Sequence, residues 1–225
     1  MSLLKELQQI MERTYQRFTG INLEEFIIGR KRFLDLSEIS QAETKELSDV
    51  ARVFFRIIQD KLYLAIYFSK EMIATLEEND PRRGLSERNI YPFIVFIEEI
   101  NHGIHAALKF TAGEKEIRRE EFVRDLELLA KIDTYLVLKF FMAYFNSSKQ
   151  LENFDRLWLR FHLFECNNYA YQHSTLSERY SETNRLGEKF TRFLDGLPPQ
   201  HRVHEIRRFR KMPYPEKARY IRMLP

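Results

Sequence analysis

The sequence predicts an all-α protein: an antiparallel bundle of four or more long helices, with short N- and C-terminal helices packed around it. Three observations favour this fold class. Hydrophobic residues recur with the helical period along nearly the whole chain. The 225 residues include only 7 Gly and 7 Pro, so sites for tight turns are few. With 19 Phe and 11 Tyr, the chain has enough large aromatic side chains to fill a thick core.

The first half of the chain predicts three helical segments. An amphipathic helix is expected over residues 2–18, and a short helix or turn within residues 21–36. The stretch SQAE, residues 40–43, has the form of a capping box, in which a Ser and a Glu side chain satisfy amide groups at the start of a helix. A long helix is therefore expected from there to about residue 78, where NDPRRG would end it.

The second half predicts four more helices. Pro92 is typical of the first turn of a helix, because its missing N–H is not needed there. A second capping box, TLSE at residues 175–178, indicates that a new helix or a kink begins at that point. The four helices are expected over residues 92–111, 115–145, 150–171 and 175–194.

The stretch DGLPPQH is the clearest boundary in the chain. We expect a helical-bundle domain over residues 1–195 and a basic C-terminal helical appendage over residues 196–225. The net charge is +3, but residues 185–225 hold 11 Lys and Arg against 4 Asp and Glu, which leaves −4 for the rest. This asymmetry indicates an acidic protein partner for residues 198–225, and the alternative is a solvated surface helix. Nucleic acid is not expected, because no known reading motif accompanies the basic residues.

The remaining composition narrows the class of protein. The single cysteine, Cys166, has no partner for an internal disulfide, so a secreted disulfide scaffold is not expected. The charged, amphipathic N-terminus is not a signal peptide, and no apolar run is long enough for a membrane span. We therefore expect a soluble cytoplasmic protein, and a homo-oligomer is compatible with the sequence.

The stretch FIEEINHGIHAALKF, residues 96–110, places two carboxylates and two imidazoles in a helix that is otherwise typical of a core. At about 100° per residue, Glu98, His102 and His105 lie within roughly 60° of one another, and Glu99 lies roughly 60° from His102 on the other side. A Glu and a His three residues apart can reach one metal ion, and these ligands suit iron, manganese or zinc. The alternative is a solvent-exposed face that carries a Glu–His pair.

Other predicted helices add candidate ligands. His162 and Glu165 are also three residues apart, in an apolar stretch where an ionised Glu needs a partner. Asp133 takes a core position in its predicted helix, and such a charge is costly to bury unless it is paired. Asp60 or Glu71 would point inward from the long helix expected in the second quarter of the chain.

These acids and the two Glu/His pairs resemble the ferritin-like di-metal carboxylate bundles, which take one Glu from each of two helices and a Glu-x-x-His from each of the other two. The stretch EINH, Glu99 to His102, matches one such motif, whereas HLFE at residues 162–165 has the inverse order. The resemblance implies an iron or manganese site that activates oxygen or stores iron. A mononuclear site built from the same histidines is the alternative. The predicted metal ligands are Glu98, Glu99, His102, His105, Asp133, His162 and Glu165.

Three function hypotheses follow. The first is a metal-binding helical-bundle protein, an iron or manganese oxidoreductase of the ferritin-like type. The alternative is a non-enzymatic helical interaction or regulatory module with a basic C-terminal docking segment. A third hypothesis is that the aromatic residues line a bundle pocket for an organic ligand. The chain has no glycine-rich phosphate loop and no local Ser/His/Asp or Cys/His signature, so the sequence predicts no particular substrate.

Overall fold

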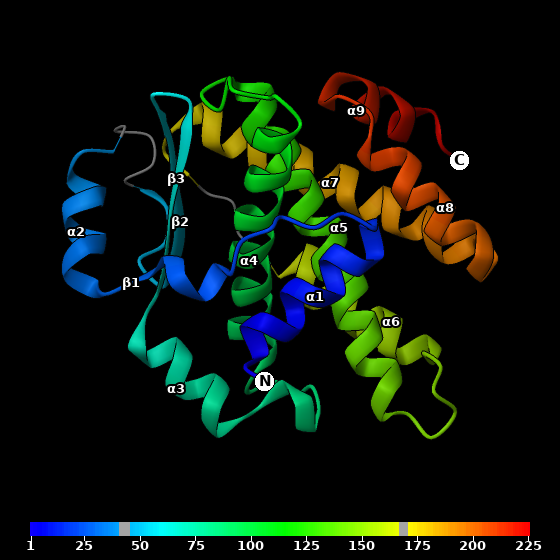
Figure 1. Ribbon diagram of the computed structural model, residues 1–225. Coiled ribbons are helices and arrows are strands. Elements are labelled where there is room, and N and C mark those ends of the chain that lie inside the picture. Colours follow the sequence, from blue (N-terminus) through cyan, green and yellow to red (C-terminus); the bar gives the residue numbers. More distant parts are fainter. Residues whose placement is uncertain (41–45, 167–170) are drawn as a thin grey trace.

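Helices make up most of the chain, and a small sheet lies on one flank of them (Figure 1). The computed structural model describes residues 1–40, 46–166 and 171–225. Within these ranges the expectation of a mostly helical protein is confirmed. A strictly all-α fold is wrong, because three strands form a mixed sheet in the first third of the chain. An antiparallel arrangement of four long helices stays a prediction.

The chain begins with two helices that flank a short strand. Helix α1 (Leu3–Tyr15) is capped by the hydroxyl of Ser2, which accepts a hydrogen bond from an amide of the first turn. The short helix η1 (Leu23–Phe26) leads into strand β1 (Ile27–Ile28). Helix α2 (Arg30–Glu38) follows directly. The first predicted helix is thus confirmed, with an end three residues earlier than expected.

A β-hairpin occupies most of the segment where a long helix was expected. Strand β2 (Ala51–Ile58) pairs antiparallel with β3 (Lys61–Phe68), and only Gln59 and Asp60 connect them. Both connecting residues have positive φ, 47° and 59°, as a two-residue hairpin turn with the twist of the strands requires. The predicted helix was wrong because a continuous run of aromatic and β-branched residues suits a strand as well as a buried helix.

The sheet has the order β1-β3-β2, with β1 parallel to β3. It packs on one face of a long central helix, α4 (Ile90–Thr111), and the two lie side by side in Figure 1. Helix α3 (Lys70–Glu78) and the short helix η3 (Pro81–Arg83) connect the sheet to that helix. The first capping box lies mostly at residues 41–45, outside the described residues.

The two longest helices follow each other. Helix α4 (Ile90–Thr111) and helix α5 (Glu120–Phe145) pack against each other along much of their lengths. Both were expected, and α5 begins five residues later than the sequence indicated. No described helix combines the length and the apolar content that a membrane span requires.

Two shorter helical pieces replace the next predicted helix. Helix α6 (Asn153–Arg160) passes into a π-helical turn, η4 (Phe161–Glu165), in which the amide of Cys166 donates to the carbonyl of Phe161. The predicted end near residue 171 follows residues 167–170, which lie outside the described ranges. Helix α7 (Ser174–Gly196) begins without a side-chain cap, so the second capping box falls inside its first turn.

Helices α8 (Pro199–Arg210) and α9 (Tyr214–Met223) close the chain (Figure 1). Helix α8 packs against α1 and α7, and α9 packs against α5 and α7. Their apolar side chains join a second hydrophobic cluster, separate from the larger one around α1, the sheet and α4. The rings of Phe190 on α7 and Phe209 on α8 stack with their centroids 4.0 Å apart. Full burial of one Phe or Ile contributes roughly 1.5–3 kcal/mol, so the basic C-terminal segment is held to the rest by its own core.

Candidate functional site

The predicted site residues of α4 lie on two different sides of that helix. Gly103 marks the side that packs on the sheet, since a Cβ atom there would lie 3.4 Å from side-chain atoms of both Ile66 and Leu23. From the helical period, Glu98 and His105 lie nearly opposite Gly103, toward α5, whereas Glu99 lies close to the sheet side. The contacts of these side chains, rather than the side of the helix alone, divide them into two clusters: His105 contacts Asp133, whereas Glu98 and His102 contact Lys131 and Glu127.

The first cluster surrounds Asp133 of α5 and is fully buried. Its carboxylate accepts hydrogen bonds from Nδ2 of Asn101 at 2.5 Å, from Nε2 of His105 at 2.9 Å and from the hydroxyl of Tyr15 on α1. The expectation that Asp133 needs a partner is confirmed, and three neutral donors satisfy it. Burial lowers the pKa of His105, although Asp133 opposes this shift, so the imidazole is neutral and donates from Nε2.

The second cluster contains the remaining carboxylates of α4 and one that the sequence analysis missed, Glu127 of α5. Nζ of Lys131 lies 2.6 Å from Oε1 of Glu98, and Nε2 of His102 lies 3.5 Å from Oε2 of Glu127. Burial raises the pKa of Glu99 and that of Glu127 to about 7. Two carboxyl groups here hold or release protons near neutral pH. The i, i+4 spacing from Lys131 is the sequence signal that could have identified Glu127.

The other predicted site residues lie elsewhere. In η4, the Nε2 atom of His162 lies 3.1 Å from Oε1 of Glu87, and its ring contacts Trp158 edge-on, while Glu165 is exposed. The expectation that Asp60 or Glu71 points inward was wrong. Asp60 sits in the hairpin turn and pairs with Lys115 at 2.8 Å, and Glu71 is exposed in the first turn of α3. Both residues were expected on one long helix, but the hairpin takes the place of much of that helix, so Asp60 and Glu71 lie on separate elements.

A metal centre stays a prediction. Among the described residues, no three His, Cys, Asp or Glu side chains are grouped so that they could hold one ion. The polar contacts of Asp133 go to hydrogen-bond donors, and Lys131 already compensates the charge of Glu98. The resemblance to ferritin-like bundles therefore gains no support from the geometry of the α4–α5 interface.

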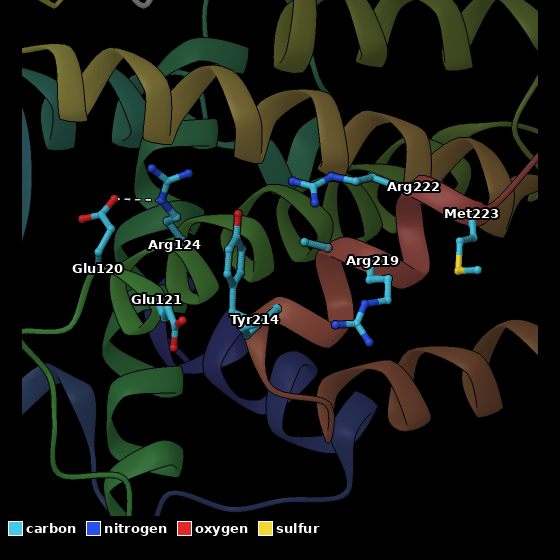
Figure 2. A pocket seen from close by; sticks show the side chains of 9 residues that line it. Glu120, Glu121, Arg124, Tyr214, Arg219, Arg222 and Met223 are labelled. Atoms are coloured by element: carbon cyan, nitrogen blue, oxygen red, sulfur yellow. Dashed lines mark hydrogen bonds and ion pairs between the residues drawn. The ribbon is translucent and has the colours of Figure 1, made fainter.

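A cavity of about 540 Å³ lies between the first turns of α5 and helix α9 (Figure 2). Figure 2 shows Arg124 beside Glu120, with Tyr214 and Arg222 on the opposite wall. Arg124 pairs with Glu120 at 2.9 Å and also with Glu182 of α7, which in turn pairs with Arg222 at 2.5 Å. Because these charges satisfy one another, the network joins α5, α7 and α9 and leaves no excess charge for a ligand.

The basic residues of the C-terminal segment are also used within the fold. Nε of Arg202 donates to the carbonyl of Leu197 at 2.7 Å, at the end of α7. Nε of Arg207 donates to the carbonyl of Thr14 at 3.0 Å, which fastens α8 to α1. Arg208 pairs with a Glu of its own helix at 2.9 Å. Part of the positive charge that was predicted to meet a partner thus holds α8 in place, through Arg202 and Arg207.

Exposed apolar side chains lie on α6 with its extension η4 and on the end of α5, and α5 and α6 pack against each other. We call this surface the α5–α6 aromatic face. On α6 and η4, Phe154, Leu157 and Phe161 are 73%, 66% and 49% exposed; on α5, Phe140 and Tyr144 are 55% and 59% exposed. This surface was not predicted from the sequence. The sequence feature that could have indicated it is that α6 has apolar residues on two faces, of which the fold covers only one.

Scans against protein-family models and searches among curated proteins and solved structures return no match. The contacts, burial and charges described above are therefore the basis for the function proposed next.

Proposed function

We propose that this protein is a non-enzymatic helical interaction module, and that the α5–α6 aromatic face is the surface on which a partner protein docks. The exposure of five large apolar side chains on two packed helices carries this proposal. Single exposed apolar residues are ordinary, but a contiguous group of them marks a surface that is covered in the functional state. Aromatic side chains are also the residues that supply most binding energy at protein interfaces.

The helix under this face is fixed before a partner arrives. Arg160, at the end of α6, donates to Asp195 at 2.8 Å and to the hydroxyl of Tyr135 at 3.2 Å. Nε1 of Trp158, on the inner side, donates to Glu87 at 2.8 Å. A rigid surface loses little conformational entropy on binding, so the outer aromatic residues are well placed to act as anchors.

The π-helical turn supports the same assignment. Phe161 begins η4, where the extra residue of the turn rotates the side chains that follow relative to those of α6. Such turns are frequent at functional sites, and this one carries Phe161 of the aromatic face. The partner that fits this face is an apolar segment of another protein, such as the apolar face of an amphipathic helix.

The two predicted alternatives are weaker on the described geometry. The basic C-terminal docking segment stays a prediction, but most of the cations named above already have partners inside the protein. The iron or manganese oxidoreductase also stays a prediction. Metal analysis of freshly purified protein tests it, together with His102→Ala and the exposed control His204→Ala. Iron or manganese that is bound by the wild type and the control but absent from His102→Ala would support the metal-binding hypothesis.

The docking proposal is tested by position-specific photo-cross-linking of the full chain in its native host. A photoreactive residue replaces Leu157 in one protein and the exposed Val203 of α8 in a control. We expect a defined cross-linked partner from position 157 only. The partner is then purified, and its affinity is measured for wild type, for Phe154→Ser with Phe161→Ser, and for the control Ile39→Ser with Ile58→Ser, at exposed positions outside this face.

Removal of two aromatic anchors is expected to weaken binding by about 100-fold or more, at roughly 2 kcal/mol for each anchor, while the control pair leaves it unchanged. Equal cross-linking from both positions, or equal affinity of the two double variants, would overturn the proposal. A concentration-dependent dimer in sedimentation that the aromatic variants abolish would instead assign the face to a second copy of this chain.

A further inference from the structure

A second cavity, of about 410 Å³, opens where the end of α4 meets the segment after α1 and the connection between α8 and α9. Its volume lies in the range of sites for small molecules. Four of its lining residues are cationic, Arg17, Lys109, Arg210 and Lys211, and one is acidic, Glu114. Lys109 pairs with Glu114 at 2.8 Å and with Asp125 at 2.7 Å, and Lys217 also pairs with Asp125 at 2.6 Å, so these two cations and two carboxylates cancel.

The other three cations make no ion pair among the described residues. Arg17 and Lys211 are exposed at the mouth. The guanidinium of Arg210 lies over the ring of Tyr15, with Cζ 5.2 Å from its centroid, and its buried Nε atom has no hydrogen-bond partner. A pocket that holds three uncompensated positive charges favours an anionic ligand.

His105 lines this cavity and offers a buried hydrogen-bond acceptor to a ligand. Its side chain is 1% exposed, and Nε2 is bonded to Asp133, yet its buried Nδ1 atom has no hydrogen-bond partner among the described residues. A buried polar atom without a partner costs about 1–3 kcal/mol, so it is rarely left so in a folded protein. Because Nε2 donates its proton to the carboxylate, Nδ1 of the neutral ring presents a lone pair and requires a donor.

The groups around His105 keep that lone pair available. Asp133 of α5 accepts from the ring and also from the hydroxyl of Tyr15 on α1. Because Nε2 is the donor to this carboxylate, Nδ1 is the acceptor atom of the ring.

We propose that this cavity binds a small oxyanion that carries a hydroxyl group, with hydrogen phosphate as the simplest example. Arg17, Arg210 and Lys211 neutralise its charge, and its hydroxyl donates to Nδ1 of His105. This site is independent of the α5–α6 aromatic face, because the two share no residue. The apolar residues Phe18 and Met212, also in the lining, leave room for an organic group on the anion.

The hydrogen-bond acceptor at Nδ1 makes the site selective for an anion that carries a proton. Hydrogen phosphate carries one proton at neutral pH, whereas sulfate of the same shape carries none. In the sulfate complex, the Nδ1 lone pair would face another lone pair, so an unpaired buried acceptor would remain. We therefore expect phosphate to bind about tenfold more tightly than sulfate or better, since roughly 1.4 kcal/mol corresponds to a factor of ten.

The test is calorimetric titration of the purified full chain with inorganic phosphate and with sulfate, at pH 7 and equal ionic strength. Absence of phosphate binding at tens of millimolar would overturn the site, and equal affinity for the two anions would overturn the assigned role of His105. A parallel pair of titrations with inorganic phosphate and glycerol phosphate at about pH 5.5, where both anions carry a proton, identifies the source of the anion. Tighter binding than that of inorganic phosphate indicates an organic phosphate, and weaker binding indicates free phosphate.

Variants distinguish binding in this cavity from nonspecific attraction of the anion to surface cations. Arg17→Gln with Lys211→Gln removes two exposed cations of the mouth and is expected to weaken phosphate binding by about tenfold or more. The matched control, Arg13→Gln with Arg219→Gln, removes two exposed cations that do not line this cavity and should leave the affinity unchanged. Equal loss in both pairs would overturn the proposal. His105→Gln, if it folds by circular dichroism, should reduce the preference for phosphate over sulfate.

Discussion

The Nζ atom of Lys217, on α9, lies 2.6 Å from Oδ1 of Asp125, on α5, and each of these side chains is 1% exposed. The two residues are far apart in the chain and meet beneath the last helix. The pKa of Asp125 is lowered, because Lys217 and Lys109 outweigh the opposing effect of burial. A lysine of the basic C-terminal segment is thus an internal counter-ion that joins this segment to the rest of the protein.

Replacement of Lys217 by Met is expected to destabilise the protein strongly. Removal of one partner from a buried ion pair typically costs about 3–5 kcal/mol, because the remaining charge stays buried. Lys109 still pairs with Asp125 at 2.7 Å, so we expect the lower end of this range. Denaturant unfolding measures the change. The control Arg219→Met, at an exposed position of the same helix, should change the free energy of unfolding by less than about 0.5 kcal/mol.

Stability should decrease as the pH rises from about 4.3 to 7, through the contribution of Glu127. Burial raises the folded-state pKa of this Glu to about 7, above roughly 4.3 in the unfolded chain. The folded protein therefore keeps a proton that the unfolded chain has lost, and this contribution is complete below about pH 4.3 and lost as the pH approaches 7.

Glu127→Gln removes this titration. The free-energy difference between the variant and the wild type should shift in favour of the variant by up to about 1.4 kcal/mol for each pH unit within that range. Unfolding curves at pH 5, 6, 7 and 8 measure it. The exposed Glu121→Gln on the same helix serves as control and should show no such trend. A flat difference for Glu127→Gln would mean that this carboxyl is already ionised in the folded state at pH 5.

Two leucines of α6, two residues apart, should respond in opposite ways to truncation. Leu157 is 66% exposed on the aromatic face, whereas Leu159 is 0% exposed in the core. We expect Leu159→Ala to cost about 2–5 kcal/mol and Leu157→Ala less than about 0.5 kcal/mol. Thermal and denaturant unfolding measure the free energy of unfolding of both variants. A comparable loss at Leu157 would show that its side chain is covered within the monomer.

The hairpin turn should tolerate glycine at position 60 better than alanine. Asp60 has a φ of 59°, in the left-handed region that glycine adopts without steric cost. Both Asp60→Gly and Asp60→Ala remove the exposed ion pair with Lys115, so only the backbone distinguishes them. We expect the Gly variant to be more stable by about 1 kcal/mol, measured by denaturant unfolding. Equal stabilities would contradict a left-handed turn at this position.

The sequence predicted most helices because a helix is a local structure. The spacing of apolar residues identified α4 and α5, and Pro and Gly positions indicated several helix ends. The hairpin was missed for a local reason as well. Gln59 and Asp60 are not one of the glycine-containing pairs that usually indicate such a turn, so two aromatic-rich strands had the pattern of one buried helix.

What the sequence alone determined is which polar residues stand in apolar surroundings; Asp133, His105 and Glu99 were all identified in this way. The tertiary structure decided their partners, because hydrogen bonds and burial depend on which helix faces meet. Tyr15 reaches Asp133 from 118 positions away, and Arg210 reaches the same region from α8. No periodicity within one helix specifies such a meeting, since the period fixes a face but not the neighbour that covers it.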